Sequence, residues 1–240
     1  MINNDSIDIY NYTFPILKSE ELINNDKYIE LKSKWPNFKL FQTTNAGQIH
    51  RNNIEIKKNN NNYKKINSLY KDLYNEFNSI EFRDFLKNKF NRFDLSNNEF
   101  IGDFENSELI MHISETCDGY ENPWHVDNRR RIIHFLIYFG NEDIINGGEF
   151  AIASHNNLEN MSEYKQYPKK DDLYNIEYFK PEDNLGFFIL SQNNSYHKGC
   201  ATNGIRRFIY AGYTNKKGDA WKTCNWKCNR NFQQELNNNK

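Results

Sequence analysis

Two histidines and one aspartate are the residues of this 240-residue chain whose types and spacing point most directly to chemistry. His125 and Asp127 lie one residue apart in the sequence WHVDN, at the start of a β-branched and aromatic stretch that is typical of a buried strand. Side chains alternate between the two faces of an extended chain, so this imidazole and this carboxylate are expected on the same side. His197, in the later sequence SYHKGC, is a second histidine that could complete one face of a metal ion. These three side chains predict a metal site.

Two adjacent arginines, Arg206 and Arg207, follow His197 at the start of the last apolar segment. Two histidines, one carboxylate and a downstream arginine are the combination that non-haem Fe(II) oxygenases use. A His-x-Asp pair by itself is weak evidence in a chain with six histidines. Its position before one strand, and that of His197 before another, carries the prediction, because two facing sheets bring such strand ends together at a barrel mouth, where ligands bind.

Helices are predicted in the first part of the chain. Apolar residues recur with helical spacing over 66–78, and Ser79 is expected to cap a second helix that runs to Phe90. A shorter helix is expected to end near Lys34, and the asparagine-rich residues 57–65 are expected to form a surface loop. The apolar stripes of the helices should pack against the outside of a sheet.

After Phe100 the pattern changes to short strands separated by polar turns. Besides the segment after His125, strands are predicted over 109–114, 149–152, 185–190 and 207–214. The polar stretch 154–183 is expected to be a long loop, and loops of that length are usually functional or mobile. The fold class predicted is mainly β with supporting helices, a two-sheet jelly roll.

The chain is expected to form a single domain over 1–240. Within it, residues 1–100 are interpreted as helix-rich N-terminal support, 101–215 as the jelly-roll catalytic core, and 216–240 as a C-terminal extension. With 38% hydrophobic and 15% aromatic residues, the chain can bury a core rich in Phe and Tyr.

Charge and composition exclude several classes of partner. The 31 basic and 32 acidic residues nearly balance, so no nucleic-acid surface is predicted. The N-terminal sequence has neither the basic nor the apolar region of a secretory signal, and no apolar run is long enough to span a membrane. Four cysteines are too few for a disulfide scaffold. The chain is therefore predicted to be a soluble cytoplasmic protein with reduced thiols.

The segment from about Glu108 to Thr214 resembles the double-stranded β-helix core of the Fe(II)/2-oxoglutarate-dependent dioxygenases, in particular their prolyl-hydroxylase-like branch. Three motifs in order carry the resemblance: HVDN from His125, GGEF from Gly147, and HKGCATNGIRRFIYAGY from His197. Each motif alone is weak, and the ordered set is specific. The resemblance covers a little under half of the chain.

The resemblance implies a role for five side chains. His125, Asp127 and His197 would be the catalytic ligands of Fe(II). Arg207 would bind the distal carboxylate of 2-oxoglutarate as a bidentate pair, assisted by the hydroxyl of Tyr138. The neighbouring Arg206, which has the opposite facing in a strand, would then point outward.

The resemblance also implies a reaction. Such an enzyme uses Fe(II), 2-oxoglutarate and O₂, hydroxylates an unactivated C–H bond, and releases succinate and CO₂. The related halogenases have a small residue at the position of Asp127, so this carboxylate favours hydroxylation. The substrate is expected to be a small molecule or a peptidyl group, and the sequence gives no indication of its identity or of the oligomeric state.

Two alternatives stay open from the sequence. A cupin-type metal enzyme would share the barrel but would not use 2-oxoglutarate, and so would not need a buried arginine on the last strand. A non-catalytic jelly-roll binding module would use His125 and His197 only as structural residues, and would be recognised by its lack of iron.

The remaining candidates are interpreted mainly as structural. His112 and His134 are expected to be hydrogen-bonded residues within strands, and His50 and His155 to lie on the surface. The basic run Arg129, Arg130 and Arg131 would normally be a solvated turn, but it could also meet an anionic substrate at the pocket mouth.

Cys224 and Cys228 could supply half of a zinc site. The chain has no second pair of cysteines except the distant Cys117 and Cys200, which argues against that site.

Overall fold

The structure is a computed structural model, and the account below concerns the residues that it describes. These are residues 1–37, 40–43, 51–58, 60–93, 104–117, 119–140, 142–156, 166–192 and 194–216. Among the helices of these ranges, none combines the length and the apolar composition that crossing a membrane requires.

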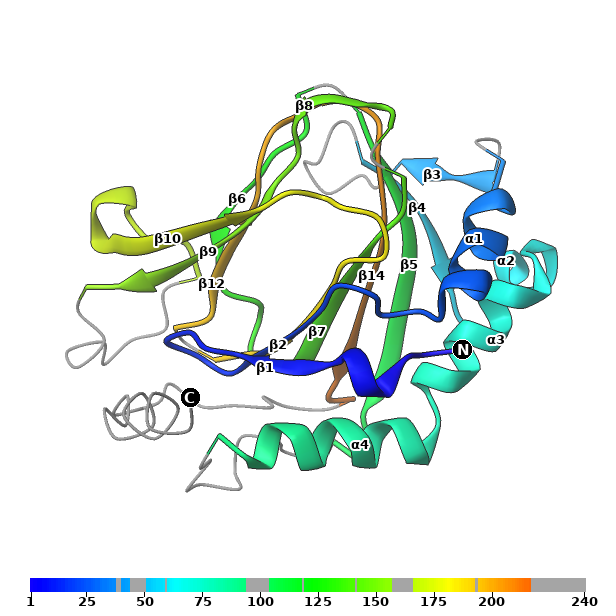
Figure 1. The fold of residues 1–240 in the computed structure, drawn as a ribbon, viewed down its shortest axis with the longest axis horizontal. Coiled ribbons are helices and arrows are strands. Elements are labelled where there is room, and N and C mark those ends of the chain that lie inside the picture. Colours follow the sequence, from blue (N-terminus) through cyan, green and yellow to red (C-terminus); the bar gives the residue numbers. More distant parts are fainter. Residues whose placement is uncertain are drawn as a thin grey trace.

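Two antiparallel sheets face each other, as the sequence predicted for a jelly roll (Figure 1). The larger sheet has the strand order β1-β2-β11-β7-β14-β5-β4-β3, and the smaller has the order β10-β9-β12-β6. The strands of the larger sheet are β1 (Asp8–Tyr10), β2 (Ile16–Ser19), β3 (Gln42–Thr43), β4 (Arg51–Ile56), β5 (Glu108–Thr116), β7 (Arg131–Tyr138), β11 (Gly186–Leu190) and β14 (Arg206–Thr214). Those of the smaller sheet are β6 (Asn122–His125), β9 (Phe150–His155), β10 (Leu173–Phe179) and β12 (Tyr196–Gly199).

A third, short pair closes one end of the molecule. β8 (Ile144–Gly147) pairs with β13 (Thr202–Gly204) at the top of Figure 1. Gly147 has a φ of +75°, and a Cβ at this position would come within 2.1 Å of the carbonyl oxygen of Ala201. The Gly-Gly turn of the GGEF motif is therefore needed for the close approach of these two strands.

Helices cover the outer face of the larger sheet (Figure 1). They are α1 (Asn25–Ser33), α2 (Asn61–Lys65), α3 (Ser68–Phe77) and α4 (Ile80–Asn91). The predicted helices over 66–78 and after Ser79 are confirmed, and the Ser79 hydroxyl accepts a hydrogen bond from the backbone N–H of Phe82, as a helix cap does. The predicted surface loop over 57–65 is partly wrong, because Asn60 caps the short helix α2.

The core between these helices and the sheet is built from aromatic residues. Phe135 of β7 is fully buried, with ring centroids 4.7 Å from Phe77 of α3 and 5.0 Å from Phe188 of β11. Tyr213 of β14 is also buried here, and its hydroxyl donates a hydrogen bond of 2.5 Å to the carbonyl of Phe77. The outward-facing residues of the central strands thus hold the helices, which leaves the other face of the same strands for the site.

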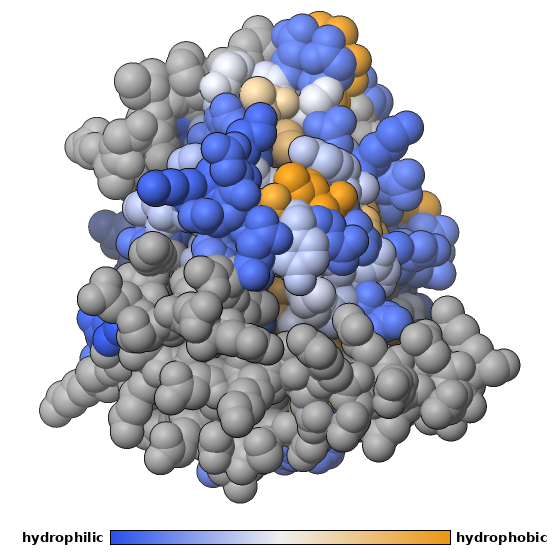
Figure 2. Space-filling view, turned by 90° about the vertical axis from the view of Figure 1, so that its left-hand side faces the viewer, coloured by the Kyte–Doolittle hydropathy of each residue, from blue (hydrophilic) through white to orange (hydrophobic). Residues whose placement is uncertain are grey.

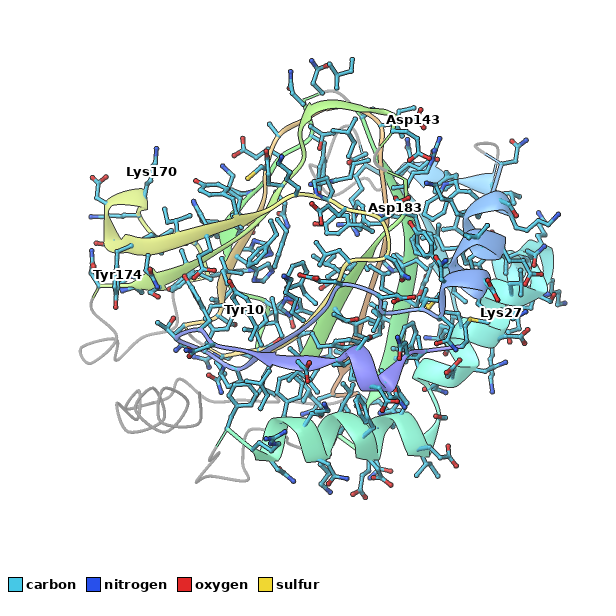
Figure 3. All side chains as sticks on the ribbon, in the orientation of Figure 1. Tyr10, Lys27, Asp143, Lys170, Tyr174 and Asp183 are labelled. Carbon is cyan, nitrogen blue, oxygen red and sulfur yellow. The ribbon has the colours of Figure 1, made fainter. Side chains whose placement is uncertain are left out.

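Two sequence predictions about organisation need correction. The first part of the chain is more than helical support, because β1 and β2 extend one edge of the larger sheet and β3 and β4 extend the other. The predicted loop over 154–183 contains a strand, since Leu173–Phe179 pairs with β9. This hairpin projects from the molecule, and Figure 3 shows Lys170 and Tyr174 at its outer end. The coloured part of the surface in Figure 2 is largely hydrophilic on this side of the molecule, with small hydrophobic areas.

Candidate metal centre and its pocket

The structure brings together the three predicted metal ligands. His125 ends β6 and pairs directly with His197 of β12, so the two imidazole rings lie side by side with their centroids 4.2 Å apart. Asp127 follows two residues after the end of β6, and its Oδ1 lies 3.9 Å from His125 Nε2. One ligand atom from each of the three side chains lies within 4.8 Å of the others. The pairing of β6 with β12 is the tertiary contact that assembles the cluster.

Both histidines are held in the protonation form that a metal ligand needs. Nδ1 of His125 lies 2.8 Å from the carbonyl oxygen of Pro123, and Nδ1 of His197 lies 2.9 Å from that of Ser195. A carbonyl oxygen only accepts hydrogen bonds, so in each neutral ring Nδ1 carries the proton and Nε2 carries the lone pair. Backbone carbonyls orient metal-bound histidines in this way in many proteins.

Asp127 is held through one of its two oxygens. Its Oδ2 accepts hydrogen bonds from Nδ1 of His134 at 2.9 Å and from the hydroxyl of Tyr210 at 3.3 Å. Nε of Arg131 lies 3.8 Å from the same oxygen. Burial alone would raise the pKa of Asp127, but His134, Arg131 and His197 together hold it well below its usual value. The group is therefore a carboxylate whose other oxygen faces His125.

His134 shows what sequence reasoning missed at this site. It was expected to be a hydrogen-bonded strand residue, and it is one, but its partner is the candidate metal ligand Asp127. The signal was its position in β7, two residues from Leu136 and four from Tyr138, which also line the pocket. Alternate residues of a strand share a face, so the three had to point the same way.

The chemistry of these donors fits a divalent transition metal. Burial lowers the pKa of His125, and burial together with His125 and His134 holds the pKa of His197 well below its usual value. Both rings are therefore neutral around pH 7, which is the ligating form. Two imidazole nitrogens and one carboxylate on one side of an open pocket match the 2-His-1-carboxylate set of non-haem iron sites.

A pocket of about 320 Å³ opens beside the cluster, between the two sheets. Arg206, Tyr138 and Phe208 line it together with the three candidate ligands. Tyr138 is buried, and that burial, against an opposing effect from Arg206, raises its pKa to about 12. Its hydroxyl is therefore protonated at neutral pH and can donate a hydrogen bond into the pocket.

The two adjacent arginines face opposite ways, and the predicted facing is wrong. Arg206 lines the pocket and is only 3% exposed, whereas Arg207 lies on the other face of β14. There, Nε of Arg207 donates to Glu115 at 3.1 Å and its Nη1 lies 2.7 Å from Asp143. The reason is the register: β14 begins at Arg206, and residues 206, 208 and 210 all line the pocket.

Arg206 has unused hydrogen-bonding capacity. Its Nη1 donates to the carbonyl of Gly148 at 2.8 Å, and its guanidinium lies over the rings of Tyr120 and Phe208. Its Nε is buried without a hydrogen-bond partner among the described residues. A buried donor of this kind is costly unless a ligand satisfies it.

One further histidine departs from its expectation, and three other candidate residues lie outside the described ranges. His155 was expected on the surface and is instead 4% exposed, stacked on Tyr196 with ring centroids 5.4 Å apart, so that expectation is wrong. His50, Cys224 and Cys228 lie outside the described residues, so the expectations about them stay predictions.

Comparison with known proteins identifies the fold. No family model matches the sequence, and no curated protein matches it. The structure is similar to a prolyl-4-hydroxylase from Pseudomonas putida, with a TM-score of 0.53 and 11% identity over 84% of this chain and 92% of that one. It is also similar to a prolyl 4-hydroxylase from Phytophthora capsici, with a TM-score of 0.52 and 13% identity over 84% of this chain and 59% of that one. The chain therefore has the double-stranded β-helix fold of these prolyl hydroxylases.

Proposed function

We propose that this protein is an Fe(II)- and 2-oxoglutarate-dependent oxygenase that hydroxylates a C–H bond of its substrate. The observation that carries the proposal is that two groups of side chains line one pocket. The first group, His125, Asp127 and His197, offers three ligands within 4.8 Å of one another. The second consists of Tyr138 and the buried Arg206, whose Nε has no partner among the described residues.

Each of these two groups of side chains matches one requirement of that chemistry. Fe(II), when bound, would supply the oxygen-activating redox chemistry, with 2-oxoglutarate as the source of electrons. His125, Asp127 and His197 would hold the ion from one side and leave the pocket side open for the cosubstrate and O₂. Arg206 replaces Arg207 as the residue that we expect to bind the distal carboxylate, because a buried guanidinium pairs strongly with a carboxylate.

The pocket also bears on the rival functions. A cupin-type enzyme that does not use an oxo acid has no need of Arg206, whose charge is buried at a cost. A non-catalytic module has no need for two histidines whose Nδ1 atoms are held by backbone carbonyls, which leaves both Nε2 atoms available in a cluster with one carboxylate. The ionised Asp127 favours hydroxylation over halogenation, because it takes the position that a halide would need.

Succinate release tests the proposal. The protein is incubated with Fe(II), ascorbate and 2-oxoglutarate, and succinate is measured for wild type and for Asp127→Ala. We expect 2-oxoglutarate turnover in the wild type and none in Asp127→Ala. The variant should also bind iron more than about 100-fold more weakly, because even residues that only support a ligand change metal affinity by about 10–100-fold.

Arg130→Ala is the matched control, because among the described residues its side chain bonds only to backbone carbonyls at the surface and is not part of the pocket lining. It should keep wild-type turnover. Equal iron affinity and equal turnover in Asp127→Ala and wild type would contradict the proposal.

A further inference from the structure

A second arginine in the pocket has no role in the chemistry proposed above. Arg51 begins β4 and lines the pocket on the side formed by β4 and β5. It is half-buried, and the sequence analysis did not single it out. Its charge is therefore a feature of the site that needs its own explanation.

Among the described residues, the hydrogen-bond and ring contacts of Arg51 are all with neutral groups. Its Nε donates to Asn53 Oδ1 at 2.9 Å, and its Nη2 donates to Ser114 Oγ at 3.4 Å. Its guanidinium carbon lies 5.3 Å from the ring centroid of Phe208 and 5.6 Å from that of Tyr210. Within the described ranges, no carboxylate forms an ion pair with Arg51. The guanidinium is thus fixed in position without a carboxylate partner among the described residues.

The residues around Arg51 add donors and no negative charge. Asn53 Oδ1 accepts from both Arg51 and Ser114, so the remaining polar group of Asn53 is its amide NH₂, a donor. Burial, with Arg51 and Arg131, lowers the pKa of His112 to about 4, so this neighbour is neutral at physiological pH. Asp127 is the one acidic side chain among the described residues that line the pocket, and it faces the metal cluster. The β4–β5 side of the pocket is therefore suited to an anion.

Arg51 and Arg206 serve different parts of the pocket. Both pair with Thr116 of β5, from opposite sides, so their Cα atoms are two strand spacings apart, about 9–10 Å. The Phe208 ring lies 5.3 Å from each guanidinium carbon. The separation of the two backbone positions allows each arginine to bind a different carboxylate.

The direction of the Arg51 side chain indicates which group that is. Arg206 turns toward the Gly148 carbonyl and Tyr120, at one end of the pocket. Arg51 instead lies over Tyr210, and the hydroxyl of Tyr210 contacts Asp127. An anion on Arg51 is thus placed on the β4–β5 side of the pocket, near Tyr210 and the metal cluster.

We propose that Arg51, together with the NH₂ of Asn53, forms a subsite for a carboxylate of the substrate. The inference rests on the proposed function, because it takes Arg206 as the partner of the cosubstrate. Nε of Arg51 is already bonded to Asn53, so the two Nη atoms are the edge that a single planar carboxylate can accept from. The substrate class is a carboxylic acid whose acid group lies near the oxidised carbon, either as a small molecule or as an acidic side chain of a peptide.

Binding to the protein loaded with Mn(II) and 2-oxoglutarate under anaerobic conditions tests this subsite. The probes are matched pairs of an acid and its primary amide: butyrate and butyramide, N-acetylglutamate and N-acetylglutamine, and a short peptide with aspartate or asparagine at one position. Broadening of the probe resonances in NMR by Mn(II) measures both the affinity and the closeness to the metal.

We expect at least one acid to bind about tenfold or more tightly than its amide. The amide has no negative charge, so it cannot form the charge-assisted hydrogen bonds that the carboxylate forms with a guanidinium. Arg51→Gln should remove this preference and leave the affinity for 2-oxoglutarate within about twofold of wild type. Arg207→Gln is the matched control, because this arginine lies on the opposite face of the sheet, and it should keep the preference. The acid–amide pair that shows the preference indicates whether the substrate is a small acid or an acidic peptide.

Three results would overturn the inference. Acids that bind no better than their amides show that no carboxylate subsite exists. A loss of 2-oxoglutarate affinity in Arg51→Gln as large as that in Arg206→Gln assigns Arg51 to the cosubstrate instead. Failure of the wild type to bind Mn(II) and 2-oxoglutarate is a separate outcome, which overturns the proposed function and this inference with it.

Discussion

The two faces of the larger sheet differ in how their polar groups are satisfied. On the helix-covered face, the Tyr213 hydroxyl bonds to a backbone carbonyl and Arg207 pairs with Glu115 and Asp143. On the pocket face of the same strands, Arg206 Nε and His134 Nε2 are buried without a hydrogen-bond partner within the described ranges. Buried polar groups are normally satisfied, so a cluster of exceptions marks a place where a ligand is expected.

This difference separates stability from function. Residues that face the helices bury apolar surface and complete their hydrogen bonds inside the protein, so changing them should mainly alter the free energy of unfolding. Several residues that face the pocket keep polar atoms that no described residue satisfies, so their replacement should mainly alter ligand binding. Substitutions on the two faces of the larger sheet should therefore have different effects.

The largest expected effect concerns the core under the helices. Phe135→Ala should lower the free energy of unfolding by about 3–5 kcal/mol, because it leaves a cavity among Phe77, Phe188 and Tyr213. Urea denaturation measures the change. Phe208→Ala, on the pocket face of β14, is the comparison, and it should cost clearly less because this ring borders the open pocket. Equal losses in the two variants would mean that the pocket face is packed as tightly as the core.

The next effect tests the two arginines of β14. Arg206→Ala should raise the KM for 2-oxoglutarate strongly, because the loss of a buried partner for a carboxylate costs about 2–5 kcal/mol. Arg207→Ala should change that KM little and should lower stability by at most about 1 kcal/mol, since its ion pairs are partly exposed. Steady-state succinate release measures both. A larger effect on KM from Arg207→Ala than from Arg206→Ala would show that Arg207 binds 2-oxoglutarate, as the sequence analysis expected.

The smallest effect concerns a single hydrogen bond on the helix-covered face. Tyr213→Phe removes the bond to the carbonyl of Phe77 and should lower the free energy of unfolding by about 0.5–1.5 kcal/mol. Turnover per folded molecule should stay at the wild-type value, as measured by succinate release below the melting temperature. A change in turnover without a change in stability would show that the two faces are coupled.

The sequence alone determined the elements whose signals are local. The helices over 66–78 and after Ser79 follow from apolar spacing and a capping side chain, and both are present. The jelly-roll fold and the convergence of His125, Asp127 and His197 were also predicted from local motifs in order. The strand at Leu173–Phe179, LYNIEYF, was missed although most of its residues are apolar or aromatic, because it lies inside a stretch that is polar on both sides.

Only the tertiary structure decided which side chains share the pocket. Adjacent residues such as Arg206 and Arg207 lie on opposite faces of β14, and the sequence holds no local signal for the register, since residues on both faces of this strand are buried. His134 reaches Asp127, and Arg51 reaches Tyr210, only because distant strands pair within one sheet. Which strands pair depends on how the whole sheet is buried and not on local sequence. These contacts therefore could not be predicted from the spacing of the residues.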